Sequence, residues 1–410
     1  MRRLFLASLS LVLAGCAASL STEPAAPGAS STSSAPSESS QLPTTPTPTA
    51  PPVSFTLVSA GDILPHPSVY NAARRGKTYD FKDQFAATRD FTERADLALC
   101  SLEVPIAPPG TQPAGYPVFG APRELVTNLK ELGWDGCTIA TNHSADRGLA
   151  GVKATVAAFR EEGLGYTGTG RSDEERATVQ TYTVKKDGRS VVVAHVSGTY
   201  GLNGIPDPGG QNFRAVNTLD DMIEAAKRAR EDGADMVVAS PHWGVEYQDS
   251  PNEEQRQVAK KLVDSGNVDV IIGTHSHVPQ PMDELTAPDG RVVPIIYSTG
   301  NFIAGQDEDC CPPNTASGAL VVVNFTASDD GVKVEGMKAV PVMIDREAGR
   351  RQYLLQAVHD GQRPEKMTIS AARVKDRWDR FTRVIPPDHL ISEIAEGGAQ
   401  VEVGARPDVP

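Results

Sequence analysis

Residues 54–66 read SFTLVSAGDILPH, an apolar run that passes directly into Gly61 and Asp62 and then reaches His66. A short apolar run rich in β-branched and aromatic residues is typical of a buried strand. In open α/β folds, ligand-binding groups gather at the carboxyl ends of the strands. The stretch therefore predicts a central strand over residues 54–60 that carries Asp62, followed by His66, into a functional site.

Apolar strand patterns alternate with helical patterns along the rest of the chain, which predicts an α/β layered fold. The further expected strands cover residues 95–99, 136–140, 191–196, 235–239, 268–272, 295–298 and 319–324. The expected helices cover residues 123–132, 149–162, 219–231, 252–265 and, near the end of the chain, 369–383. Asp187-Gly188 between two apolar runs predicts a β-hairpin.

Side chains that can bind metal ions follow the ends of several of these strands. They are Asp62, Glu103, Asn142, His143, His242, His275 and His277. Taken singly, each has an ordinary structural explanation, such as a turn for Asp62 or a helix cap for Asn142. Independent structural reasons would not place so many of them at the ends of successive strands. The sequence therefore predicts one site, at the carboxyl ends of the strands.

The segment His275-Ser276-His277 is the most specific element of this set. On an extended segment, residues i and i+2 can present their imidazoles to two adjacent metal ions, or both to one. Glu103 follows an apolar strand, where a buried carboxylate is costly without a cation, and it is a candidate to bridge two ions. A nitrogen and oxygen ligand set without thiolates suits Mn²⁺, Fe, Zn²⁺ or Mg²⁺. Two divalent ions are expected, with His143 left free for proton transfer.

Four other residues are not expected to take part in the site. His195 lies inside the apolar run VVVAHVSG and is predicted to be a core histidine. Asp96 stands at the start of its strand, away from the strand ends that carry the site, and is predicted to lie on the surface. For Trp243 and Tyr247, ordinary packing is favoured over a role at the mouth of the site.

The amino terminus has the pattern of an export signal with a lipid anchor. Arg2 and Arg3 precede an apolar run that ends in the sequence LAGC, with Cys16 as its last residue. This pattern predicts a signal peptide over residues 1–15 and lipidation of Cys16. The mature protein is then expected to be extracytoplasmic and attached to the cell membrane through its lipid.

The composition of the chain divides it into three parts after the signal. Residues 16–52 are almost entirely Ser, Thr, Pro, Ala and Gly, which is typical of a disordered tether. Residues 53–344 are expected to form one domain, and residues 345–410 a C-terminal extension. The formal net charge is −13, and the chain has no Lys/Arg cluster, which argues against nucleic acid as a partner.

Four cysteines follow Cys16, and the compartment permits disulfides. For Cys100 and Cys137, which lie in apolar strand patterns, two buried thiols and a bridge are equally supported. The adjacent Cys310 and Cys311 lie in the polar sequence DEDCCPPN, where oxidation is the more plausible.

The order of these motifs resembles the CapA family of capsule synthesis proteins, named for poly-γ-glutamate capsule production, whose domain is similar to calcineurin-like metallophosphatases. The matching stretches are residues 61–66 (GDILPH), 101–103 (SLE), 141–148 (TNHSADRG), 242–247 (HWGVEY), 271–280 (IIGTHSHVPQ) and 296–302 (IYSTGNF). In metallophosphatases at large the first motif is Asp-x-His, whereas here His66 stands four residues after Asp62.

The resemblance implies an α/β/β/α sandwich with two metal ions at the carboxyl ends of its strands. It implies that Asp62 and His277 bind one ion, that Glu103 lies between the ions, and that His143 lies near the leaving group. The implied ligands of the other ion are Asn142, His242 and His275. His66 is a further candidate ligand beside this set.

Two functions are compatible with these residues. The first is a metal-dependent hydrolase of the phosphoesterase type, which acts on a phosphoester or on an amide linkage of an extracellular polymer. The second is a non-catalytic accessory protein that binds or exports an anionic cell-surface polymer such as poly-γ-glutamate. An acidic chain repels such a polymer unless metal ions or a local basic face attract it.

Overall fold

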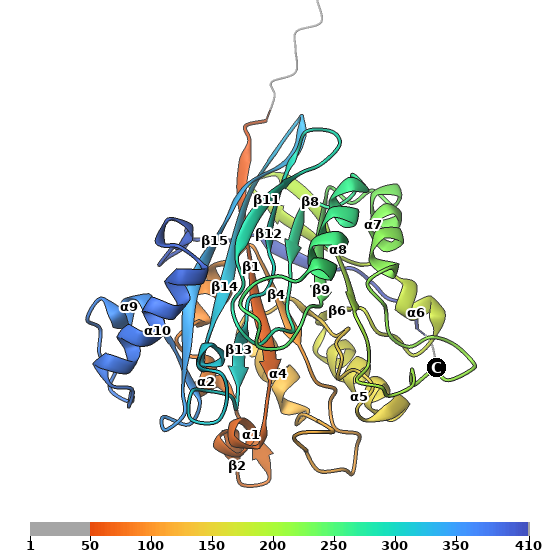
Figure 1. Ribbon diagram of the computed structural model, residues 1–410. Coiled ribbons are helices and arrows are strands. Elements are labelled where there is room, and N and C mark those ends of the chain that lie inside the picture. Colours follow the sequence, from red (N-terminus) through yellow and green to blue (C-terminus); the bar gives the residue numbers. More distant parts are fainter. Residues whose placement is uncertain (1–49, 409–410) are drawn as a thin grey trace, which may run out of the picture. The chain divides into compact units, whose positions relative to one another are not determined.

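The computed structural model describes residues 50–408, which form two β-sheets covered by helices (Figure 1). The first sheet contains β1 (Val53–Leu64), β4 (Leu97–Leu102), β5 (Gly136–Thr138), β6 (Gly165–Thr167), β13 (Asn301–Ala304), β14 (Ser317–Ser328), β15 (Gly331–Asp345) and β16 (Arg351–Leu354). The second contains β7 (Gln180–Lys186), β8 (Arg189–Thr199), β9 (Met236–His242), β10 (Val270–Ile272), β11 (Met282–Thr286), β12 (Val292–Ile296) and β17 (Gln400–Val403). Cys16 and the expected signal peptide lie outside the described residues.

The helices in residues 50–408 are α1 (Pro67–Ala73), α2 (Lys82–Phe85), α3 (Arg89–Arg94), α4 (Glu124–Glu131), α5 (Gly148–Glu162), α6 (Asp173–Ala177), α7 (Asp221–Glu231), α8 (Glu253–Asp264), α9 (Leu355–His359) and α10 (Ala371–Val384). Helices α4, α5, α7 and α8 cover the outer faces of the two sheets, whereas α9 and α10 pack against the core between the sheets. Two 3₁₀ turns, η1 (Pro313–Ala316) and η2 (Pro387–His389), and a short ribbon of β2 (Arg74–Arg75) and β3 (Thr78–Tyr79) complete the elements. Within residues 50–408, no helix combines the length and the apolar character needed to span a bilayer.

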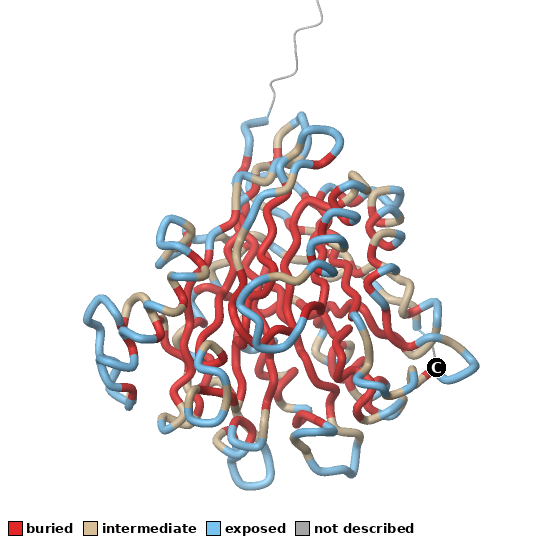
Figure 2. Tube along the Cα trace, viewed as in Figure 1, coloured by how far each residue is buried: buried red, intermediate tan, exposed pale blue. Residues whose placement is uncertain are grey.

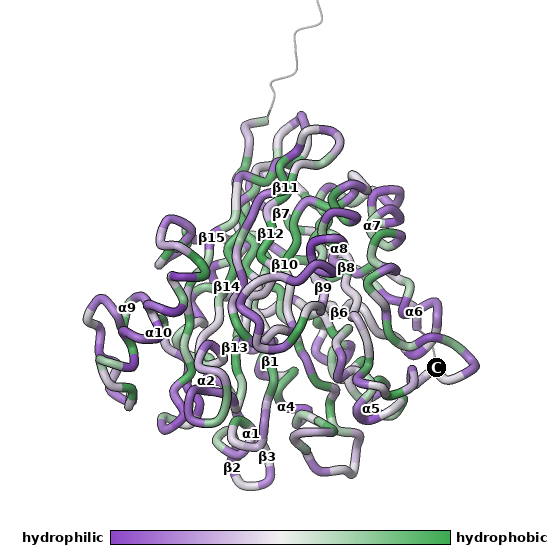
Figure 3. Tube along the Cα trace, viewed as in Figure 1, coloured by the Kyte–Doolittle hydropathy of each residue, from purple (hydrophilic) through white to green (hydrophobic). Residues whose placement is uncertain are grey.

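The strands of both sheets are apolar on both faces, because each sheet is covered on both sides. On β1, Phe55 and Leu57 point into the core between the sheets, whereas Val58 and Ala60 point into the core under α4 and α5. A third core lies between the second sheet and helices α7 and α8. The buried strands and their apolar character are visible in Figures 2 and 3. Since side chains alternate along a strand, one buried strand serves two cores, and the α/β/β/α layering is confirmed.

Parallel strands form the centre of each sheet. In the first sheet β1, β4, β5 and β6 run parallel, and β13 adds to β1 in the same direction. In the second sheet β8, β9, β10 and β12 run parallel. The predicted strands and helices all occur, and the Asp187-Gly188 turn joins β7 to β8 as expected. The carboxyl ends of the parallel strands are therefore where side chains from both sheets can meet.

The last part of the chain joins both sheets. Strand β16 pairs with β15 in the first sheet, and β17 pairs with β7 in the second. Helix α10, close to the helix expected over residues 369–383, packs Val374 and Phe381 against the core between the sheets. Strand β15 was not among the expected strands, since it includes Gly336 and Pro341, which are depleted in strand interiors.

The prediction that Asp96 lies on the surface is wrong. Its side chain is 1 % exposed and accepts hydrogen bonds from the Thr56 amide (2.9 Å), the Lys186 ammonium (3.0 Å) and the Ala399 amide (3.1 Å). Lys186 and Ala399 come from distant parts of the chain that cover the start of β4. A carboxylate can be buried here because donors and a cation surround it.

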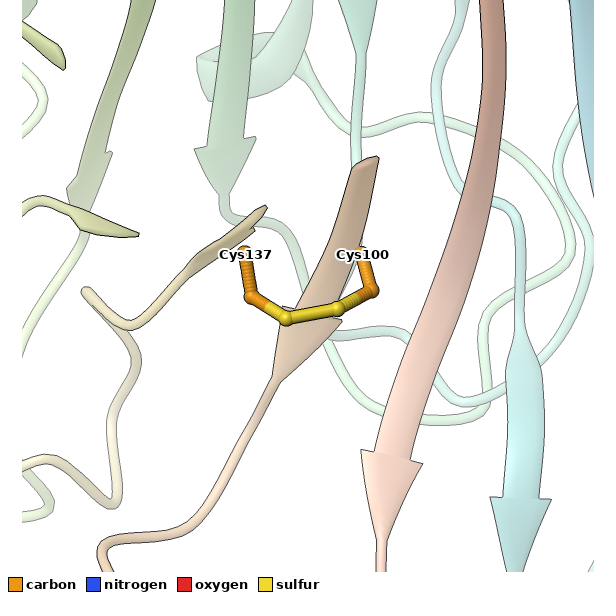
Figure 4. The surroundings of a disulfide bond; sticks show 2 residues. All are labelled: Cys100 and Cys137. Carbon is orange, nitrogen blue, oxygen red and sulfur yellow. A yellow bond between two sulfur atoms is a disulfide. The ribbon is translucent and has the colours of Figure 1, made fainter. Parts of the chain in front are cut away.

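The structure decides between the two alternatives for Cys100 and Cys137, and it contradicts the expected oxidation of Cys310 and Cys311. Cys100 in β4 and Cys137 in β5 are directly paired in the parallel register and form a disulfide (Figure 4). Cys310 and Cys311, where oxidation was the more plausible, are free thiols. Strand register decides the outcome, since it brings together two cysteines that are 37 residues apart.

Candidate metal centre

The carboxyl ends of strands from both sheets bring the predicted site residues together. Asp62, near the end of β1, pairs in register with Ser101 of β4 and with Asn301 of β13. Glu103 follows β4 directly, and its amide donates to the carbonyl oxygen of Ile63 (3.2 Å). In the second sheet, His242 ends β9 and forms a parallel bridge with Thr274, the residue before His275. Backbone pairing therefore determines which side chains meet.

Two groups of buried side chains have the geometry to hold a metal ion. One comprises Asp62, Glu103 and His277, and the other comprises Glu103, His242 and His275. In each group one potential ligand atom from every member lies within 4.8 Å of the others. The five residues are 0–2 % exposed. Glu103 belongs to both groups, so its carboxylate lies between two potential cation positions.

The polar atoms of this centre are incompletely satisfied by the protein. Both carboxylate oxygens of Glu103 and the Nδ1 atom of His275 are buried and have no hydrogen-bond partner among the described residues. Burial raises the pKa of Glu103 well above its ordinary value, and Asp62 adds to this rise, although His277 opposes it. A buried carboxylate without donors is costly, and a divalent cation would remove this cost. The residues present therefore fit a metal ion.

His277 lies between the two carboxylates of its group. Its Nδ1 is 3.4 Å from Asp62 Oδ2, and its Nε2 is 3.6 Å from Glu103 Oε1. Burial alone would lower the pKa of His277, but the charges of Glu103 and Asp62 raise it to about 10. Burial also lowers the pKa of His242 and of His275 well below the ordinary value, and here no carboxylate reverses it. Neutral imidazoles of this kind are the form that binds metal ions.

The segment with the two histidines is bent, so the expectation of an extended segment is wrong. His275 and His277 have backbone φ angles of 95° and 60°, in the left-handed region. Such conformations cost on the order of 1–3 kcal/mol each in non-glycine residues and are concentrated at functional sites. The preceding Gly273 leaves no room for a side chain, since a Cβ atom there would lie 2.1 Å from the carbonyl oxygen of Tyr297. The bend directs the two imidazoles to different groups.

Neighbouring polar groups orient the ligands of the second group. The Nδ1 atom of His242 is 2.9 Å from Thr274 Oγ1, and its Nε2 is 2.9 Å from Asn142 Oδ1. The backbone amide of His275 lies 3.2 Å from Asp62 Oδ2, to which it donates. The amide oxygen of Asn142 is thus placed beside His242, where it could join this group as an oxygen ligand.

His143 lies near the centre but in neither group. Its Nδ1 is 2.8 Å from Asp146 Oδ2, which also accepts a hydrogen bond from the Phe119 amide (2.7 Å). The edge of the Phe119 ring packs against His143, with the ring centres 4.8 Å apart. A carboxylate on one ring nitrogen fixes the orientation of the imidazole and leaves the other nitrogen available for a proton.

The remaining candidate residues have different surroundings. His66 is in neither group, and its Nδ1 is 3.1 Å from the Leu64 carbonyl oxygen and from the Gly305 amide. Burial lowers the pKa of His66 to about 4. His195 is a buried core histidine as predicted, 2.8 Å from Ser240 Oγ. Trp243 is buried in the core between the second sheet and helices α7 and α8, so for this residue the packing interpretation is confirmed.

Sequence reasoning missed a chain of side chains behind His277. Asn301 Oδ1 lies 3.2 Å from His277 Nδ1, and Asn301 Nδ2 donates to Gln306 Oε1 (3.0 Å). Gln306 Nε2 in turn donates to the Tyr247 hydroxyl (3.1 Å). Asn301 could have been found in the same way as the other residues, because it is a polar residue that follows an apolar run, at residues 295–298.

Ion pairs hold the loop that carries Gln306. The next residue, Asp307, is buried and accepts hydrogen bonds from Arg346 (2.7 Å) and from the buried Arg350 (2.8 Å). Glu308 accepts a hydrogen bond from Arg377 of α10 (2.9 Å). These arginines belong to the last part of the chain, which is thereby connected to the metal centre.

The family model for the bacterial capsule synthesis protein PGA_cap matches residues 56–306, a range that contains all the candidate ligands. The chain belongs to this family. Among curated proteins, this PGA_cap member is 32 % identical over 191 residues to the capsule biosynthesis protein CapA of Bacillus anthracis, covering 46 % of this chain and 44 % of that protein. It is 31 % identical over 250 residues to the PGA biosynthesis protein CapA of Bacillus subtilis (strain 168), covering 57 % of this chain and 59 % of that protein. The chain thus spans about half the length of the curated relatives it matches.

Solved structures with low overall similarity include two phosphatase-type proteins. The calcineurin-like phosphoesterase YfkN from Bacillus subtilis has 13 % identity and a TM-score of 0.44, over 81 % of this chain and 98 % of that chain. A novel phosphatase from Mycoplasma pneumoniae has 17 % identity and a TM-score of 0.42, over 71 % and 94 %. At these scores they do not bear on the site, which is described by the residues of the PGA_cap chain alone.

Proposed function

We propose that this PGA_cap protein holds two divalent cations and acts as a metal-dependent hydrolase of the phosphoesterase type. The observation that carries the proposal is the position of Glu103, which is shared by both ligand groups and whose oxygens have no donor among the described residues. A carboxylate between two cation positions is the arrangement that two-metal hydrolases use.

Each side chain has a distinct role in this proposal. Asp62 and His277 would hold one ion, Asn142, His242 and His275 the other, with Glu103 between them. When bound, such ions lower the pKa of a water molecule and stabilise an anionic tetrahedral transition state. His143, oriented by Asp146, would donate a proton to the leaving oxygen. Thr274 and the His275 amide keep His242 and Asp62 in place.

The cellular role is part of the same proposal. The names of the relatives refer to capsule and PGA biosynthesis, and we propose a link to poly-γ-glutamate capsule formation on this basis. The chain would be anchored in the membrane by the lipid on Cys16, and residues 16–52 would hold the domain of residues 53–344 and its extension, 345–410, outside the cell. Replacing Cys16 by Ser should release the protein from the membrane fraction; unchanged membrane association would contradict the anchor.

A second candidate is a non-catalytic accessory protein for an anionic polymer. The relatives' names favour it, since they describe a biosynthetic process and not a reaction. The His143–Asp146 pair favours hydrolysis, because a group that only binds metal has no need of an oriented imidazole outside both ligand groups.

Metal analysis combined with an assay separates the two candidates. The purified chain, equilibrated with Mn²⁺ and then desalted, should retain two ions per chain and hydrolyse 4-nitrophenyl phosphate. Two bound ions without hydrolysis of any phosphoester would favour the accessory role. If the chain retains no metal, the proposed two-ion centre is excluded, whichever of the two functions the protein has.

A further inference from the structure

Exposed apolar side chains are concentrated around the metal centre. The large hydrophobic side chains that are exposed in residues 50–408 are Tyr116, Val118, Tyr200, Val245, Tyr247 and Val292. All but Val292 lie on segments that adjoin the predicted site residues. Val292 is the first residue of β12, whereas the site lies at the carboxyl ends of the strands. The loops that carry them are exposed, in contrast to the buried strands behind them (Figure 2). Such clustering at a site indicates ligand contact.

Two of these tyrosines lie directly against candidate ligands. The Tyr200 ring centre is 4.6 Å from that of His275, and the Tyr247 ring centre is 6.0 Å from that of His277. Tyr200 is 41 % exposed and Tyr247 is 40 % exposed, so each ring contacts a histidine and also presents surface to solvent. The two rings therefore adjoin the two different ligand groups.

A third tyrosine lies on the side of His143. Tyr116 is 82 % exposed, and its ring centre is 6.5 Å from that of Phe119, which packs against His143. We call Tyr116, Tyr200 and Tyr247 the tyrosine rim. Tyr200 lies against His275 and Tyr247 lies against His277, whereas Tyr116 is separated from His143 by the ring of Phe119.

Hydrogen bonds hold two members of the rim in place. The Tyr200 amide donates to the His242 carbonyl oxygen (3.1 Å). The Tyr247 amide donates to the Ser276 carbonyl oxygen (2.8 Å), and its hydroxyl accepts from Gln306. The Tyr247 ring, which is held through both its backbone and its hydroxyl, loses little entropy when a ligand packs against it.

The segments that carry the tyrosine rim have little positive charge of their own, although Arg214 and Lys261 line the same pocket as Tyr200. Residues 116–119, 200–203 and 245–248 contain no Lys or Arg, and they include the exposed Glu246. Uncharged aromatic faces bind flat rings by stacking.

On the basis of the function proposed above, we propose that the tyrosine rim binds a flat heteroaromatic ring of the substrate. The substrate class is then a phosphoester whose alcohol carries such a ring, as a nucleotide does. In the reaction, the oxygen of water bonds to phosphorus, the bond between phosphorus and the alcohol oxygen breaks, and a proton from His143 neutralises the leaving oxygen. One proton of the water stays on the phosphate, and the other returns to His143. The products are inorganic phosphate and the ring-bearing alcohol.

Two substrates with the same leaving group test this inference. Adenosine 5′-monophosphate and ribose 5-phosphate both release a 5′-alcohol, but only the first carries a flat ring. The full chain with Mn²⁺ should have a kcat/KM for the nucleotide that is higher on the order of tenfold, since stacking on an aromatic side chain contributes about 1–3 kcal/mol per base. Tyr200→Ala and Tyr247→Ala should reduce this ratio through KM, and the Phe variants should retain it. Val292→Ala, the matched exposed control, should leave the ratio unchanged.

The outcomes separate this inference from the function on which it rests. Equal kcat/KM values for the two substrates, or a preference that survives both Ala variants, would overturn the rim as a ring-binding site. The inference would also be overturned if poly-γ-glutamate inhibits the hydrolysis of 4-nitrophenyl phosphate at concentrations where adenosine monophosphate does not. If neither substrate is hydrolysed, the proposed hydrolase fails, and equilibrium dialysis then decides the inference. The nucleotide should bind more tightly than ribose 5-phosphate and lose this advantage in the Ala variants, and equal binding would reject it.

Discussion

Asp96 and Glu103 flank the same strand, β4, and both are buried, but their surroundings are opposite. Asp96, before the strand, accepts hydrogen bonds from two backbone amides and from Lys186. Glu103, after the strand, has no donor for either oxygen among the described residues. The carboxylate of Asp96, which contributes to stability, has hydrogen-bond donors on the protein. The carboxylate of Glu103, which faces the proposed cations, has none among the described residues. Burial alone therefore does not distinguish a structural acid from a functional one, whereas its hydrogen-bond partners do.

Metal removal should have the largest effect in this comparison. An ion present at about 1,000 times its Kd stabilises the folded chain by about 4 kcal/mol, because it binds the folded state only. Mn²⁺ should therefore raise the free energy of unfolding in urea relative to EDTA. Glu103→Gln should lose most of this difference, since both groups share Glu103. Equal unfolding curves of the parent chain in Mn²⁺ and EDTA would contradict the interpretation that Glu103 faces bound cations.

Replacing His143 should separate catalysis from metal binding. His143→Ala should lower kcat for phosphoester hydrolysis by a factor on the order of 10² to 10⁴, the usual contribution of a general acid or base. Its metal content should remain that of the parent chain, because His143 is in neither ligand group. Loss of metal in step with activity would assign His143 to coordination instead.

The satisfied carboxylate should respond in the opposite way. Asp96→Asn should lower the free energy of unfolding by about 3 kcal/mol, because it leaves the Lys186 charge without its partner in a largely buried position. Bound metal and its stabilising effect should not change. Denaturant unfolding and metal analysis of the same preparation measure both quantities, and a reduced metal content would show that the two ends of β4 are coupled.

The smallest effect is expected behind the centre. Asn301→Ala should weaken metal binding at the Asp62, Glu103 and His277 group by about 10- to 100-fold, because partners of this kind orient ligating histidines. Metal titration should show one weakened and one normal site. As a control, His195→Gln changes a buried histidine away from both groups and should leave both sites intact. Two equally weakened sites would argue against an orienting role.

Much of this architecture could be predicted from the sequence because the decisive signals are local. The apolar run of β1 and the polar residue after it are neighbours in the chain, so the strand and the position of Asp62 at its carboxyl end follow from one short pattern. The same holds for Glu103, His242 and His275. Which sheets these strands join, and that Glu103 lies between two groups, depends on pairing across the chain. The apolar strand before it already marked Glu103 as a candidate to bridge two ions, and the resemblance to CapA proteins implied the same position.

The errors, and the alternatives that stayed open, have a common physical cause. The burial of Asp96 and the bridge between Cys100 and Cys137 depend on contacts between segments that are far apart in sequence. The bend at His275 and His277 depends on positive φ angles, which no propensity predicts for histidine. Ligation by His66 remains a prediction, since its contacts with Leu64 and Gly305 neither require nor exclude it.

The connection between the loop at Gln306 and the arginines of the last part of the chain has a consequence for the order of folding. Synthesis proceeds from the amino terminus, so the strands that carry the candidate ligands are complete before Arg346, Arg350 and Arg377 exist. Until these residues arrive, the loop that supports Asn301, and through it His277, lacks its ion pairs. The two ligand groups would therefore mature in sequence, with the group that contains His277 completed last.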